Sequence, residues 1–227
     1  MRIALNLRLV AGLAVIATPF TASADDFAPP PWRGEPLSAV AEWEFLTPPQ
    51  NWFFIPPDAM STTPGTGGEL FNEGFATHAE VDLASNWMWT PADGDGGITP
   101  ATGVFVAGIA FKMANWIDLE PIKYLRAQIT WSGQIPPQIF ALTGYEEAQP
   151  LPIPFPGSPA GDPVTIDGNH FYYDWIILPN PDWEVLEIDV HEGTVLDEII
   201  IDTWSVPAPG ALAIFGVALA GISNRKR

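Results

Sequence analysis

Two aspartates in a glycine-rich segment are the clearest candidate for metal chemistry in this sequence. Asp93 and Asp95 lie in the stretch Pro-Ala-Asp-Gly-Asp-Gly-Gly of residues 91–97. Two carboxylates one residue apart on a flexible loop can both turn toward a hard cation such as calcium. The third acid and the distant glutamate of an EF-hand are missing, so an acidic turn without metal is the simpler interpretation. We carry Asp93 and Asp95 forward as a candidate Ca²⁺ site.

Two tryptophans next to this loop form a candidate ligand platform. Trp87 and Trp89 are spaced by two, so on a strand their side chains project from the same face, about 7 Å apart. Adjacent indole rings can stack on the apolar faces of sugar rings. The alternative is that this face is the interior of the domain, where large aromatic side chains usually lie.

Recognisable catalytic motifs are absent from the sequence. It has no nucleophile elbow, no H-E-x-x-H and no phosphate-binding loop. The chain has no cysteine, which excludes thiol catalysis, and its three histidines, at positions 78, 170 and 191, show no ligand spacing. Carboxylates are abundant, so a glycosidase acid pair stays open as an alternative, because sequence does not give the distance between carboxyls. We expect a protein without enzymatic activity.

The segments around these residues predict an all-β fold. The chain of 227 residues contains 20 glycines and 25 prolines, which favours short strands joined by loops over long helices. Residues 60–68 read as a loop, and residues 125–131 and 135–142 read as a hairpin. The predicted strands cover residues 39–45, 51–55, 78–83, 86–90, 103–111, 125–131, 135–142, 170–178, 184–190 and 195–204. This pattern indicates a single antiparallel β-sandwich, jelly-roll-like, with an open barrel as the alternative.

The first residues predict export. Arg2 and Arg8 precede an apolar run, and Ala22-Ser23-Ala24 offers the small residues that signal peptidase accepts. Residues 1–24 are therefore expected to be a signal peptide, cleaved before Asp25. The following residues 25–36 are rich in proline and acid, and we predict a disordered arm there.

The last residues predict attachment to a membrane. Residues 210–222 contain no charged residue and would rise about 20 Å as a helix, against roughly 30 Å of hydrocarbon. Arg225, Lys226 and Arg227 follow, and a basic cluster of this kind holds its end of a segment in the cytoplasm. The preceding chain would then lie outside the cell.

The order of these C-terminal features resembles the PEP-CTERM sorting signal. Val206-Pro207-Ala208-Pro209 stands where that family has Val-Pro-Glu-Pro, and the apolar segment and basic cluster follow. The resemblance implies processing by an exosortase-type enzyme near the motif, with Ala208 as a departure from the family's glutamate. Residues 192–204 also resemble the final strand of many such exported proteins, which often come from exopolysaccharide-producing Gram-negative bacteria.

The charge of the exported part limits its partners. Between Asp25 and Pro207 there are 27 acidic and four basic residues, a net charge of −23. Such a surface repels nucleic acid and anionic lipid, and it also favours solubility. We therefore expect a β-sandwich ectodomain over residues 37–205 and a sorting signal over residues 206–227. Its location would be the cell envelope or extracellular matrix, in association with exopolysaccharide and with glycan as a candidate ligand. A secreted glycan hydrolase and a purely structural matrix component are the alternatives.

Overall fold

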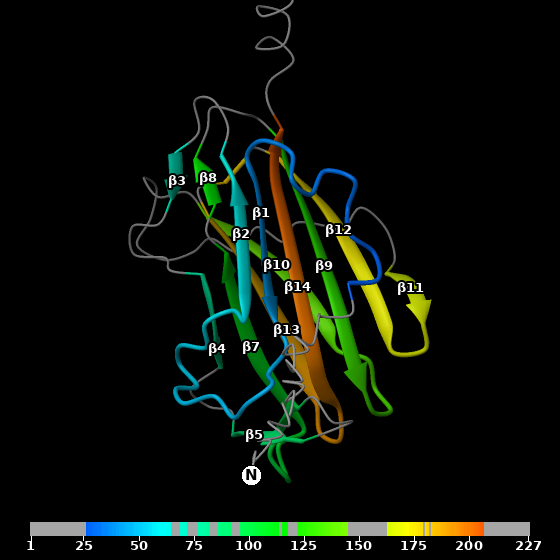
Figure 1. Cartoon of the computed structure of the whole chain (residues 1–227). Coiled ribbons are helices and arrows are strands. Elements are labelled where there is room, and N and C mark those ends of the chain that lie inside the picture. Colours follow the sequence, from blue (N-terminus) through cyan, green and yellow to red (C-terminus); the bar gives the residue numbers. More distant parts are fainter. Residues whose placement is uncertain are drawn as a thin grey trace, which may run out of the picture.

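The computed structural model describes residues 26–64, 69–71, 77–81, 86–91, 96–113, 115–117, 122–144, 163–178, 180–181 and 183–206. Every regular element in these ranges is a strand, and two antiparallel sheets pack together (Figure 1). The predicted β-sandwich is therefore confirmed. The same ranges contain no helix that could span a membrane.

The larger sheet has the strand order β11-β12-β9-β14-β1-β2, and the pair β5–β6 joins it because β6 also pairs with β14. Its strands are β1 (Ser38–Trp43), β2 (Ala59–Thr63), β5 (Trp87–Thr90), β6 (Gly97–Pro100), β9 (Ile122–Ser132), β11 (Val164–Asp167), β12 (His170–Ile177) and β14 (Val195–Val206). Residues 59–63 form the edge strand β2 although the sequence predicts a loop there. Their pairing with β1 overrides the loop-like composition.

The smaller sheet has the order β10-β13-β7-β4, and two short strands, β3 and β8, form a separate ladder. The bounds are β3 (Glu69–Phe71), β4 (His78–Val81), β7 (Val106–Met113), β8 (Asn115–Ile117), β10 (Gln138–Gly144) and β13 (Trp183–His191). Only the backbone of β3 is described.

The path of the chain between the sheets is jelly-roll-like. The strands β7, β9, β10, β12, β13 and β14 alternate between the smaller and the larger sheet, and β14 returns to lie beside β1. The predicted hairpin is therefore wrong, because β9 and β10 lie in different sheets. At Gly133, which follows β9, φ is 130° and an added Cβ would lie 2.7 Å from the carbonyl oxygen of Gly193. The turn therefore requires glycine, as the sequence indicated, but it connects β9 in the larger sheet to β10 in the smaller sheet and does not close a hairpin.

The core lies between the two sheets and follows the alternation of their strands. On β9, Leu125, Ala127 and Ile129 face inward and are almost completely buried. Trp43 on β1 meets the ring of Phe111 edge-on at 5.0 Å. Burial of each large side chain of this kind contributes about 1.5–3 kcal/mol to folding.

Residues 26–36 differ from the predicted disordered arm, since they lie against the outer face of the larger sheet. The guanidinium of Arg33 donates to both carboxylate oxygens of Asp202, at 2.5 and 2.6 Å, and also pairs with Asp26. The backbone N–H of Ala28 donates to Oε1 of Gln128, and the carbonyl oxygen of Ala28 accepts from Nη1 of Arg126. Proline and acid composition suggested a solvated arm, but the sheet beneath offers buried polar partners.

Candidate functional site

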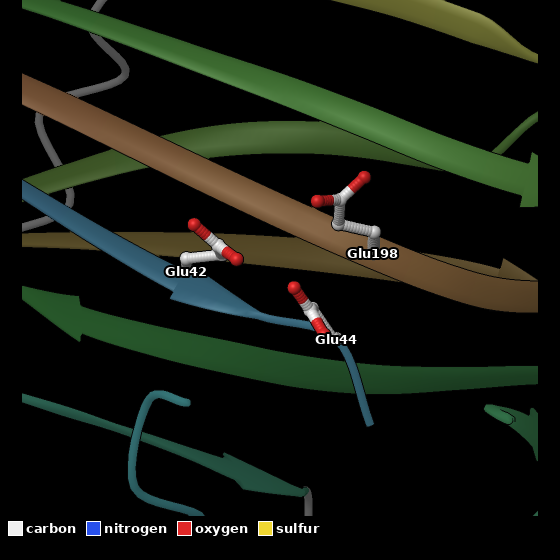
Figure 2. A group of neighbouring side chains, drawn as sticks. All are labelled: Glu42, Glu44 and Glu198. Atoms are coloured by element: carbon white, nitrogen blue, oxygen red, sulfur yellow. The ribbon is translucent and has the colours of Figure 1, made fainter. Parts of the chain in front are cut away.

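Three glutamates gather on the outer face of the larger sheet (Figure 2). Glu42 lies on β1, Glu44 follows two residues later, and Glu198 lies on the neighbouring strand β14. Side chains two apart on an extended chain share a face. The register pairs Trp43 with Ile199, so the continuing chain brings Glu44 beside Glu198. One carboxylate oxygen of each residue lies within 4.8 Å of the others.

Burial makes this cluster unusual. Glu44 and Glu198 are each 8% exposed. Burial, a hydrogen bond with Glu42 and the neighbouring negative charges of Glu42, Glu198 and Asp58 raise the pKa of Glu44 to about 8. Glu44 is therefore mostly protonated at neutral pH. Its backbone N–H donates to Oδ2 of Asp58 at 2.8 Å, which ties the cluster to the start of β2.

The chemistry open to the cluster is limited. Calcium takes six to eight oxygen ligands, and three carboxylates with one oxygen each supply only part of that set. A retaining glycosidase needs two carboxyls about 5–5.5 Å apart that flank a bound sugar. The two cavities on the loop between β1 and β2 do not include Glu42, Glu44 or Glu198 in their lining. A proton held on Glu44 reduces the repulsion between these acids.

Two cavities lie on the loop that connects β1 and β2. The first has a volume of about 420 Å³, and apolar residues such as Pro48 and Phe54 line it together with Gln50, Asn51 and Asp58. The ring of Phe54 stacks on His78 with centroids 4.6 Å apart. Both volumes fall in the range of small-molecule sites, about 300–1,000 Å³.

The second cavity has a volume of about 390 Å³ and shares Gln50 and Asn51 with the first. Its other lining residues include Trp52, Phe53 and Trp87, and the amide of Asn86. The two cavities therefore adjoin along the loop. Aromatic rings and neutral amides dominate the second one, which is a pattern typical of sites for polar, uncharged ligands.

The predicted tryptophan platform does not form an open surface. Trp87 is 9% exposed and belongs to the core, while half-buried Trp89 packs against the core and donates from Nε1 to the carbonyl of Phe45 at 2.7 Å. The face of β5 that carries them turns toward the sandwich interior, so the core interpretation fits both. Trp87 also lines the second cavity.

Several predicted site residues lie outside the described residues. These are the candidate calcium ligands Asp93 and Asp95 and, in the sorting motif, all residues beyond Val206. Val206 itself ends β14 and pairs with Ile122 of β9. No family model matches the sequence, and no curated protein matches it significantly.

Sequence reasoning missed both the glutamate cluster and the loop cavities. Glu42 and Glu44 were recognisable as a polar face of one strand, but Glu198 is remote in sequence. The run from Gln50 to Phe53 combines two amides with two aromatic rings, and that composition was the available indication of a binding loop.

Proposed function

We propose that the chain is an exported protein of the cell surface or extracellular matrix, associated with exopolysaccharide, which binds glycan without cleaving it. The observation that carries binding is the pair of adjoining cavities on the β1–β2 loop, with aromatic rings and neutral amides in their lining. The predicted signal peptide and the PEP-CTERM resemblance support the location.

The lining of the cavities favours binding over hydrolysis. Glycoside hydrolysis by the usual mechanisms needs two carboxyls on opposite sides of the scissile bond. Asp58 is the single carboxylate among the residues that line the two cavities. One acid without a partner can orient a hydroxyl group but does not supply both the acid and the base.

Binding without turnover is the first expected result. The purified full-length protein should co-sediment with insoluble polysaccharides and give a measurable dissociation constant with soluble ones. Prolonged incubation should release no reducing ends above the level of a buffer control. Release of reducing ends would support the hydrolase alternative, and absence of binding to every polysaccharide would support the structural one.

Export is the second expected result. Mass spectrometry of the native protein should find its N-terminus at Asp25, which leaves Asp26 in place to accept from Gln128 Nε2 at 2.8 Å. Deletion of residues 207–227 should move the protein from the envelope to the medium, because the apolar segment and its basic end are lost. Recovery of Met1 in extracellular material, or unchanged envelope retention after the deletion, would contradict the proposal.

A further inference from the structure

Three buried polar side chains join the two sheets at one end of the sandwich. Lys123 lies at the start of β9, Ser205 pairs with it from the end of β14, and Glu184 lies at the start of β13 in the opposite sheet. All three residues are 0% exposed. Nζ of Lys123 lies 3.1 Å from Oε1 of Glu184 and donates to Oγ of Ser205 at 3.1 Å. An amine and a carboxylate are therefore in contact where water is excluded.

The side-chain amide of Asn180 reaches the same hydroxyl group. Nδ2 of Asn180 donates to Oγ of Ser205 at 3.3 Å, so the amide and the amine of Lys123 contact one oxygen atom. The hydroxyl group of Ser205 donates in turn to the carbonyl of Trp116 at 3.4 Å, and its lone pairs accept the two nitrogen donors. Asn180 is half-buried and lies on the segment that leads into β13. An amine, an amide and a carboxylate thus converge from three parts of the chain.

The chemistry of these groups is that of amide exchange. An amine attacks an amide only in its neutral form, so the ammonium of Lys123 must first lose a proton. Glu184 is placed to accept it, because proton transfer needs a heavy-atom distance of about 2.6–3.2 Å. The transfer turns a buried ion pair into two neutral groups, which removes the cost of holding charges away from water. The same carboxyl can then give a proton to the nitrogen that leaves.

The residue after Asn180 closes the usual route by which an asparagine loses its side-chain nitrogen. In that route the backbone N–H of the next residue attacks the side-chain carbonyl carbon. Pro181 has no backbone N–H, so Asn180 cannot react with its own backbone in this way. The chain also has no cysteine, so a disulfide cannot link the two sheets, whereas an amide bond needs no oxidant.

We propose that the folded protein joins Lys123 to Asn180 by an amide bond between their side chains, with Glu184 as the catalytic residue. The amide of Asn180 turns toward Nζ of Lys123, because attack needs roughly 3–3.5 Å between the reacting atoms. Nζ attacks Cγ of Asn180, the new C–N bond forms, and the bond from Cγ to Nδ2 breaks. Nζ gives up two protons through Glu184: one leaves on Nδ2 as ammonia, and the other stays on the carboxyl. No atom is oxidised or reduced.

The bond connects β9 of the larger sheet with the segment that enters β13 of the smaller sheet. It is independent of glycan binding, so either proposal can fail without the other. Protein that has not reacted keeps the ion pair of Lys123 and Glu184. The contribution of that pair to stability is therefore measured in an Asn180→Ala background, where no bond can form.

High-resolution mass spectrometry of the purified full-length protein, denatured before the measurement, tests the proposal. We expect most molecules to be lighter than their sequence requires by the mass of one ammonia molecule. Trypsin should no longer cleave after Lys123, because the amine is blocked, so residues 113–126 should stay linked to the fragment that begins at Ala127. Fragmentation of the linked peptides should locate the bond at Asn180.

Three variants separate the roles of the reacting groups. Asn180→Ala removes the amide and Lys123→Met removes the amine, so each should restore the full mass in all molecules. Glu184→Leu keeps both reactants and should lower the reacted fraction at least tenfold; glutamine is unsuitable there because it would offer Lys123 a second amide. Lys112→Met, which breaks the surface pair with Glu80, is the matched control and should keep the loss of ammonia.

The parent protein alone can contradict the proposal, since a folded parent with its full mass would overturn it. A loss of ammonia that persists in Asn180→Ala or in Lys123→Met would also overturn it, because cyclisation at another asparagine would then be the source. Loss of one water molecule in place of ammonia would assign the link to a carboxyl group such as that of Glu184, and would overturn the role of Asn180.

Discussion

Replacement of Lys123 by methionine is expected to lower the free energy of unfolding by about 3–5 kcal/mol, because it leaves a buried carboxylate without its cation. Lys123 on β9 and Glu184 on β13 lie in opposite sheets, and both side chains are 0% exposed. Nζ of Lys123 lies 3.1 Å from Oε1 of Glu184 and donates to Oγ of Ser205, also at 3.1 Å. Urea denaturation at neutral pH measures the loss.

The double variant Lys123→Met with Glu184→Leu should recover most of this loss, since apolar pairs often replace buried ion pairs at no net cost. Lys112→Met is the matched control. Nζ of Lys112 lies 2.8 Å from half-exposed Glu80, and loss of such a surface pair should cost no more than about 1 kcal/mol. If Lys123→Met costs no more than Lys112→Met, the buried pair is not a strong constraint on the sandwich.

The free energy of unfolding should fall as the pH rises from about 4.5 through 8. Folding raises the pKa of Glu44 from 4.5 to about 8, with burial as the largest cause. In this window the native state holds a proton that the unfolded chain has released. The contribution of Glu44 to the free energy of unfolding is therefore fully present below pH 4.5 and is lost as the pH rises through 8. The slope is at most about 1.4 kcal/mol per pH unit for one proton.

Glu44→Gln mimics the protonated form and should remove this component. Urea denaturation of both proteins at pH 5 to 8.5, with a chelator to exclude divalent cations, should show the parent losing about 2–4 kcal/mol relative to the variant. Glu35→Gln changes the net charge equally at an exposed position and controls for general self-repulsion. A parent and a Glu44→Gln variant with parallel pH profiles would contradict the proton in the cluster.

Local patterning in the sequence was sufficient for most strands and for the class of fold. Alternation around Leu125, Ala127 and Ile129 predicted which face of β9 is buried, because side chains on a strand alternate with a period of two. Composition also placed glycines at true turns, such as Gly133. The glycine did not show in which direction the chain leaves this turn. A glycine permits several backbone conformations, and the packing of the two sheets selects one of them.

Composition was misleading where tertiary partners were decisive. Residues 59–63 and 26–36 contain few of the residues that indicate packing, yet β1 pairs with the first segment, and Asp202 and Gln128 hold the second. A polar segment gains order when a sheet offers it matched hydrogen-bond partners, and those partners are remote in sequence.

The sequence by itself determined the acidic charge of residues 25–207 and the alternating strands of a sandwich, and it is the basis of the proposed export and sorting segments. Only the tertiary structure decided that Glu44 meets Glu198, that Lys123 meets Glu184 across the core, and that Trp87 lies in the core and not on an open platform. Each of these depends on which strands become neighbours and in which register. That choice is made by the packing of the whole core, since a period-two pattern shows which residues share a face but not what that face meets.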